Sequence, residues 1–197
     1  MGLHIHNLGN LPKTVDERDY FIYVLDYGWK EPLTDALVAN FTNMARMAFE
    51  TRSVVVAGIE PVHFANEVFS WHRINGEDGE EILPAILITT LTPSYFKESY
   101  DEFSGSDEFK DKLLIIPLKK ACKTTDDVIN LIKSIFKDIR EKKKLSGFSI
   151  AKEINKNGFR RLANRWLWRA AVHVRLAKTL SRRAKLGVFC GVKVPVG

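Results

Sequence analysis

Residues 20–25 read YFIYVL and are followed at once by Asp26, Tyr27 and Gly28. A continuous run of aromatic and β-branched residues, closed by turn-forming residues, is typical of a strand buried on both faces of a sheet. The same kind of run recurs at residues 53–59 (SVVVAGI), 82–88 (ILPAILI) and 112–118 (KLLIIPL). The sequence therefore predicts a sheet of about four strands, most of them parallel.

Segments with the apolar periodicity of helices lie between these predicted strands in the sequence. Apolar residues recur every three or four positions after Pro32, a residue that suits the first turn of a helix. Strands that alternate with helices predict an α/β fold in which helices cover both faces of the sheet, a three-layer sandwich. The main helices are expected from Pro32 to about Glu50, after Pro61, and from Thr124 to Lys144, with a short helix from Tyr95 to about Tyr100.

Charge divides the chain near residue 145. Residues 1–145 carry 18 Lys and Arg against 23 Asp and Glu, whereas residues 146–197 carry 12 against the single acid Glu153. Such a break indicates segments with different physical roles. We expect an irregular arm at 1–18, an α/β domain at 19–145, and a basic amphipathic helical extension at 146–197.

The basic extension predicts an amphipathic helix of about 25 residues, with Phe159, Leu162 and Trp166 on its apolar face. Clustered cations attract phosphates, and tryptophan stacks on exposed bases, so RNA or single-stranded DNA fits this composition. A protein partner, self-association and an anionic membrane surface fit it too, as does docking of the apolar face on the α/β domain. The residues expected to bind are Arg160, Arg161, Arg165, Trp166, Trp168, Arg169, Arg175, Arg182 and Arg183.

Residues 21–139 resemble a thioredoxin fold. A strand leads into Trp29-Lys30-Glu31-Pro32 at a helix start, and Leu83-Pro84 precedes a later strand as the family's cis-proline does. A capped helix then closes the domain. The position of the family's redox motif carries no cysteine here, so the resemblance implies a redox-inactive relative.

The same stretch is also similar to Toll/interleukin-receptor-type and other flavodoxin-like domains. In those families a strand such as residues 86–89 ends in a turn like Thr92-Pro93-Ser94-Tyr95. An acidic catalytic residue often follows on the next helix, which would make Glu98 or Glu102 the candidate, although the Trp-Cys pair that precedes it in the family is absent. This resemblance implies a nucleotide-processing enzyme, for example one that hydrolyses NAD.

Ligands of parallel α/β sheets bind at the carboxyl ends of the strands. The residues that follow the first three strands would converge on one crevice, where an acid serves as a base and an aromatic ring stacks on a nucleobase. The alternative is that Asp26-Tyr27-Gly28 is only a turn and that the acids cap helices. The expected pocket residues are Asp26, Tyr27, Trp29 and His63, with Thr89 to Ser94 beside them and Glu60, Glu98 and Glu102 as candidate bases.

Motifs of several enzyme classes are absent from the sequence. It contains no phosphate-binding GxxxxGK[ST] loop, no GxGxxG, no GxSxG and no HExxH. Cys122 and Cys190 form no CxxC and are expected to be unpaired thiols. His63 and His72 face opposite sides of one predicted helix, so we expect no metal and no cofactor.

The N-terminal residues lack a secretory signal pattern, and no apolar run approaches the roughly 20 residues that a membrane-spanning helix needs. The sequence therefore predicts a cytoplasmic protein. We interpret it as an interaction or regulatory module that binds a partner or polyanion through its basic extension. The alternative is the nucleotide-processing enzyme described above.

Overall fold

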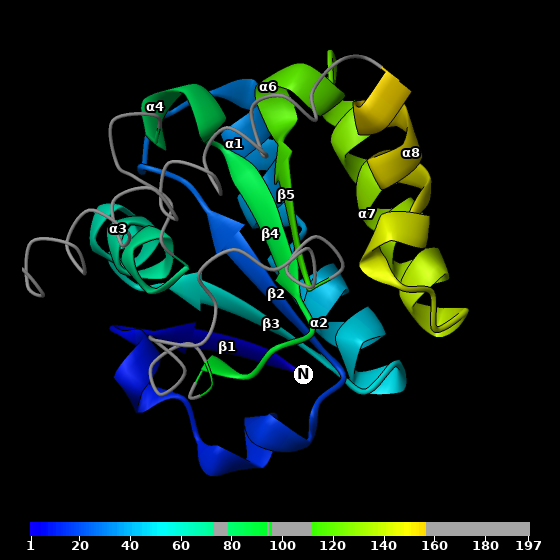
Figure 1. The fold of residues 1–197 in the computed structure, drawn as a ribbon. Coiled ribbons are helices and arrows are strands. Elements are labelled where there is room, and N and C mark those ends of the chain that lie inside the picture. Colours follow the sequence, from blue (N-terminus) through cyan, green and yellow to red (C-terminus); the bar gives the residue numbers. More distant parts are fainter. Residues whose placement is uncertain (73–78, 94, 96–111, 157–197) are drawn as a thin grey trace, which may run out of the picture.

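The structure of the protein is a computed structural model that describes residues 1–72, 79–93, 95 and 112–156 (Figure 1). Its centre is a five-stranded open sheet in the order β1-β3-β2-β4-β5. β2 is parallel to β3, as is β1, whereas β4 is antiparallel to both of its neighbours. The strands are β1 (Gly2–Ile5), β2 (Tyr20–Leu25), β3 (Ser53–Gly58), β4 (Ala85–Thr89) and β5 (Leu113–Pro117).

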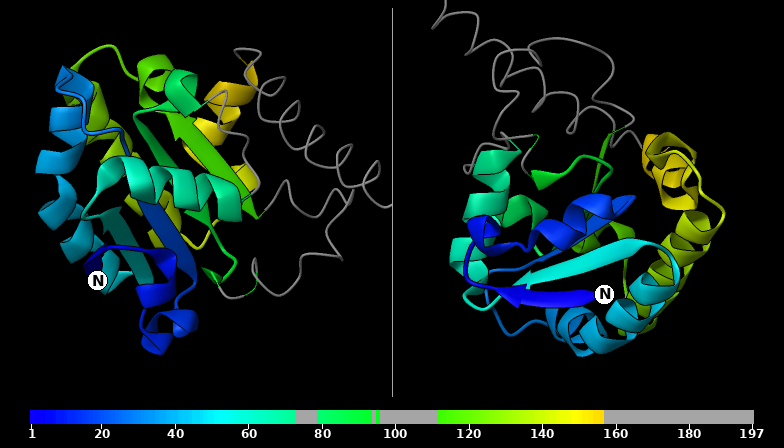
Figure 2. Two further views of the ribbon diagram at one scale, coloured as in Figure 1. Left: turned by 90° about the vertical axis from the view of Figure 1, so that its left-hand side faces the viewer. Right: turned by 90° about the horizontal axis from the view of Figure 1, so that it is seen from below.

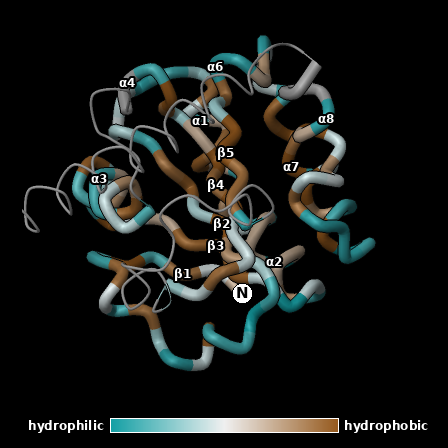
Figure 3. Tube along the Cα trace, in the orientation of Figure 1, coloured by the Kyte–Doolittle hydropathy of each residue, from teal (hydrophilic) through white to brown (hydrophobic). Residues whose placement is uncertain are grey.

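Helices cover both faces of this sheet, which confirms the predicted α/β class (Figures 1 and 2). Successive residues of β2 point to opposite faces, so Ile22 and Val24 enter one core cluster and Phe21 and Tyr23 the other. β2 and β4 are accordingly buried along their whole length and consist mainly of apolar residues (Figure 3). The first cluster is covered by α1 (Pro32–Ala39), α2 (Phe41–Glu50), α7 (Thr125–Arg140) and α8 (Ser149–Lys156), and the second by α3 (Pro61–Trp71) and the 3₁₀ turns η1 (Leu8–Asn10) and η2 (Lys13–Glu17).

The prediction of an irregular arm at residues 1–18 is wrong for Gly2–Ile5, which form β1. Val55 N–H donates to Met1 O and Ile59 N–H donates to Ile5 O, each at 2.9 Å. The first residue of β1 has to be glycine, because a Cβ atom at Gly2 would overlap the Cβ of Ala45 on α2. A strand of four residues that begins at glycine carries too little apolar pattern to be recognised in the sequence.

The single helix expected from Pro32 to Glu50 is interrupted at Asn40. The side-chain Nδ2 of Asn40 donates to Ala36 O at 2.8 Å, while Asn40 O accepts from Met44 N at 2.9 Å. Asn40 therefore ends α1 and begins α2, because its amide competes for the carbonyl groups of the last turn.

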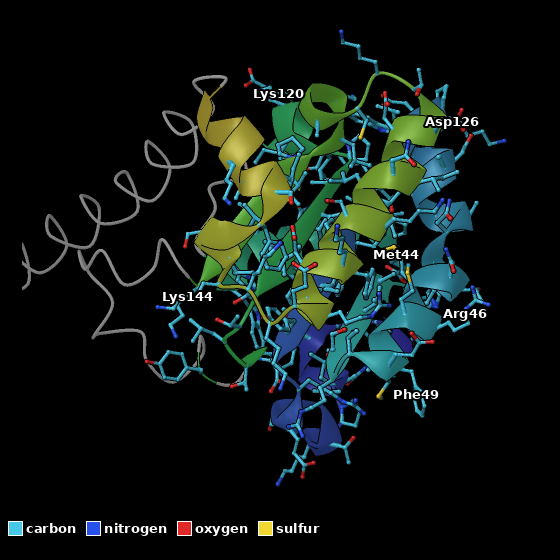
Figure 4. All side chains as sticks on the ribbon, turned by 90° about the vertical axis from the view of Figure 1, so that its right-hand side faces the viewer. Met44, Arg46, Phe49, Lys120, Asp126 and Lys144 are labelled. Atoms are coloured by element: carbon cyan, nitrogen blue, oxygen red, sulfur yellow. The ribbon has the colours of Figure 1, made fainter. Side chains whose placement is uncertain are left out.

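The packed core extends beyond the boundary expected at residue 145. Thr124 and Asp127 form a capping box at the start of α7, which then crosses the sheet (Figure 4). After α7, the turn η5 (Leu145–Gly147) leads into α8, and Phe148 and Ile150 are buried in the first core cluster. The α/β domain thus includes the first residues of the predicted extension.

A buried carboxylate fixes this C-terminal turn. Asp138 is 1% exposed and accepts from Lys143 Nζ at 2.6 Å and from Ser149 N at 2.7 Å. Burial opposes the charge of Asp138, but these hydrogen bonds hold the pKa of its carboxyl below the usual value. We call Asp138, Lys143 and Ser149 the Asp138 latch, because they join the end of α7 to the start of α8.

Several predicted features lie outside the described residues. They are the basic helix beyond Lys156 with all nine of its binding candidates, the candidate bases Glu98 and Glu102, and Cys190. Within the part of the chain that the structure describes, no helix has the length and apolarity needed to cross a membrane.

Candidate functional site

One end of the sheet gathers the residues that follow β2, β3 and β5. Leu25 of β2 pairs with Ala85, and Ala85 pairs in turn with Pro117 of β5. The first turns of α1, α3 and α6 (Leu118–Ala121) therefore meet at this end. We call the side chains of Tyr27, Trp29, Ile59, Val62 and Lys119 at this end the sheet-end surface.

A tight turn links β2 to this surface. Gly28 N donates to Asp26 Oδ1 at 2.6 Å, and Gly28 adopts a φ of 71°, a left-handed conformation that favours glycine. Burial raises the pKa of the Asp26 carboxyl, and the hydrogen bond from Gly28 acts in the opposite direction. Asp26 thus stabilises the turn between β2 and α1, which the sequence offers as the alternative to a role in a ligand pocket.

Trp29 is 45% exposed and is nevertheless held in place. The Tyr27 ring meets the indole edge-on, with 5.4 Å between the ring centroids. Lys119 Nζ lies 5.6 Å from the indole centroid and 3.0 Å from Glu31 Oε1. Each of these partly exposed contacts is weak, but together they restrict the rotamers of an aromatic side chain that stays open to solvent.

Two more apolar side chains lie at the same end of the sheet. Ile59 and Val62, which follow β3, are each about half exposed. Pro61 stands between them in the sequence, and its Cγ lies 3.9 Å from the position of a Cβ added to Gly28. Among the described residues, three of the six large hydrophobic side chains that are exposed belong to this surface. The described part of the chain therefore exposes three large apolar side chains at this end of the sheet.

The predicted crevice is wrong in one respect. Because β4 runs antiparallel to β2, Thr89 pairs with Phe21, at the end of β2 opposite to Asp26. Thr89 and the turn that follows therefore lie away from Tyr27 and Trp29. The sequence pattern of a buried strand does not show its direction, so the antiparallel orientation of β4 could not be predicted from the sequence.

The other candidate residues form no catalytic arrangement with these. His63 and Glu60 are exposed at the start of α3, and the Glu60 side chain makes no capping hydrogen bond. The residues that the structure describes contain no group of three His, Cys, Asp or Glu side chains able to hold a metal. Cys122 is a buried free thiol, and burial together with the charge of Asp127 raises its pKa to about 11.

The sequence predicts Tyr27 and Trp29 as site residues, but it gives no signal for the side chains that lie beside them. Lys119 and Glu31 are distant in the chain and meet only because β5 ends beside β2. The sequence predicts Ile59 within a buried strand, whereas β3 ends at Gly58 and the Ile59 side chain is exposed beyond the strand end. No protein-family model, curated protein or solved structure matches this chain.

Proposed function

We propose that this protein is an interaction module, a redox-inactive thioredoxin-like domain that binds a protein partner through the sheet-end surface. Exposed Trp29, restrained by Tyr27 and Lys119, is the observation that carries the proposal. Tryptophan and tyrosine are enriched among the residues that dominate protein interfaces. A side chain that is already restrained also loses less rotamer freedom when a partner covers it.

The surroundings of Trp29 favour a protein partner over a purely anionic ligand. Lys119 lies beside the indole, but Glu31 neutralises it at 3.0 Å. Apolar Ile59 and Val62 extend the surface on the side of β3, and exposed Lys30 and Glu60 adjoin Trp29 and Ile59 in the sequence. An apolar centre with a mixed polar rim is the usual composition of a protein–protein interface.

The thioredoxin-like reading is supported by the way β2 leads into Trp29 and a helix that begins at Pro32, and by the capped helix α7. The Leu83–Pro84 peptide bond is cis, as that resemblance implies. No cysteine occupies residues 29–32, so a thiol–disulfide activity at this turn is not part of the proposal.

The proposal is tested with the full chain and two variants. Trp29→Ala removes the centre of the surface, whereas Val38→Ala truncates an exposed apolar side chain on α1. We expect proteins captured by the wild type to be retained by Val38→Ala and lost from Trp29→Ala, with at least tenfold weaker binding of the purified partner, the effect of a hot-spot residue. Equal binding by the two variants would reject the sheet-end surface as the binding site.

A second candidate function is polyanion binding through the basic C-terminal segment. Residues 157–197 contain ten Lys and Arg and no Asp or Glu. Such a segment binds RNA or single-stranded DNA with an affinity that falls steeply as salt increases, because counterions are released from the phosphates. The same basic segment could also bind the phosphate groups of an anionic membrane surface.

The second candidate is tested by charge neutralisation. The four substitutions Arg160→Gln, Arg161→Gln, Arg165→Gln and Arg169→Gln are made together in the full chain. Binding to a single-stranded RNA oligomer should weaken, and the slope of log affinity against log salt should become shallower by about 3. An unchanged slope would exclude these arginines, and binding to anionic vesicles alone would favour the membrane.

A further inference from the structure

The outer edge of β1 carries no paired strand in the described part of the chain. β1 is the first strand in the order β1-β3-β2-β4-β5, and among the described strands only β3 pairs with it (Figure 2). Met1 O and Ile5 O accept hydrogen bonds from β3, and main-chain groups of a strand alternate in direction. The N–H and C=O groups of Gly2 and His4 therefore point away from the sheet. An unpaired edge of this kind is a template for another strand.

The opposite edge of the sheet is protected. β5 ends at Pro117, which has no amide hydrogen to donate. The turn η5 also packs against β5. Pairing through β5 is therefore restricted, whereas nothing comparable in the described residues guards β1.

An exposed aromatic side chain lies on the helix that flanks β1. α2 packs against both β1 and β3, and its residues Phe41 and Ala45 contact Gly2 and His4. Phe49, one helical turn beyond Ala45 on the same face, is 75% exposed (Figure 4). It is the most exposed of the large hydrophobic side chains in the described part of the chain. Its position beside an open strand edge marks the two features as parts of one surface.

We infer that this surface joins two copies of the chain, with β1 pairing antiparallel to β1 of the second copy. A two-fold axis at Leu3 places Gly2 opposite His4 of the other copy, so that each such pair exchanges both of its main-chain hydrogen bonds. The sheet then continues from one copy into the next. Backbone groups that face outward in one copy are satisfied by the same groups of the other.

The position of α2 favours a second copy over an isolated peptide strand. Neighbouring strands lie about 4.8 Å apart, and α2 lies over β1 and β3, so its axis is about 5 Å from the two-fold axis. The two α2 helices would thus be about 10 Å apart on the same face, which is the distance of directly packed helices. A second copy therefore covers Phe49 as well as the strand edge.

Two variants test this inference in the full chain. His4→Pro removes an outward-facing N–H that the β1–β3 pairing does not use, and His4→Ala is its control because it keeps the N–H and removes the same ring. Phe49→Glu places a charge at the α2 contact, and Val38→Glu is its control at an exposed site on α1. Circular dichroism checks that each variant is folded.

The readout is the mass in solution, measured by light scattering over a range of concentrations. We expect the wild type and the two controls to have twice the chain mass of 22.5 kDa, and His4→Pro and Phe49→Glu to have the mass of one chain. Hydrogen exchange of the main-chain amide of residue 4 should be slow in the wild type, His4→Ala and Val38→Glu and faster in Phe49→Glu. A monomeric wild type, or a dimer that persists in both His4→Pro and Phe49→Glu, would overturn the inference. Trp29 lies outside this surface, so Trp29→Ala should remain dimeric.

Discussion

His72 should make the protein less stable as the pH falls below its ordinary pKa. Its ring is 2% exposed, Nδ1 lies 2.7 Å from Val68 O, and the Tyr23 ring packs against it with 5.5 Å between centroids. Burial lowers the pKa of His72 from 6.5 to about 4, although the hydrogen bond with Val68 acts in the opposite direction. The folded protein therefore keeps this ring neutral at a pH where the unfolded chain protonates it.

The size of the effect follows from these two pKa values. Well above pH 6.5 neither the folded nor the unfolded state binds the proton, and His72 makes no pH-dependent contribution to stability. Below this pH the unfolded state binds more protons, so the free energy of unfolding decreases as the pH falls. Between about pH 7 and pH 4.5 the loss is about 2–3 kcal/mol, and it levels off below about pH 4.

The assay is urea unfolding at several pH values for the wild type and for His72→Asn, which can still donate to Val68 O and does not titrate in this range. Carboxylates such as Asp138 also lose stabilising charge in acid, but they do so in both proteins. The wild type should lose about 2–3 kcal/mol more than His72→Asn over this interval. Parallel pH profiles of the two proteins would show instead that the buried ring does not resist protonation.

Three substitutions test the packing of the fold by urea unfolding. Asp138→Asn should cost about 2 kcal/mol, since a buried acceptor of charge-assisted hydrogen bonds is lost, while exposed Asp16→Asn should have little effect. Thr124→Ala removes the capping box of α7 and should cost about 1 kcal/mol. Gly58→Ala places a Cβ into the Phe64 side chain and should destabilise the protein by about 1–3 kcal/mol. A change below about 0.5 kcal/mol in any of these would contradict the assigned contact.

The central strands and the long helix α7 could be predicted because their patterns are continuous. The run at residues 20–25 is fully buried, and the capping signal at Thr124 and Asp127 forms the bonds that its spacing indicates. Such features depend on neighbouring residues in the sequence. They leave the direction of a strand and the identity of its neighbours undetermined.

The errors arose where distant segments decide the structure. β1 is stabilised by pairing with β3 and by the contact between Gly2 and Ala45, neither of which leaves a local signal. The boundary at residue 145 followed the charge break, but Phe148 belongs to the core and the Asp138 latch holds the following helix. A charge pattern reports on the solvent-exposed surface, whereas burial determines where a domain ends.

The residues of the sheet-end surface could also be predicted only in part from the sequence. Trp29 could be selected because it follows a buried strand, but its restraint by Lys119 requires that β5 end beside β2. The amino-acid composition alone predicts binding through the arginine-rich C-terminal segment. The geometry of the described residues adds the sheet-end surface of the α/β domain as a further candidate.

The most direct test of the proposed function compares partner binding by the wild type, Trp29→Ala and Val38→Ala with purified partner and full-length chains. If Trp29 is the centre of the binding surface, Val38→Ala binds as the wild type does and Trp29→Ala binds at least tenfold more weakly, with its fold and solution mass unchanged. Wild-type affinity in Trp29→Ala would exclude the sheet-end surface as the binding site.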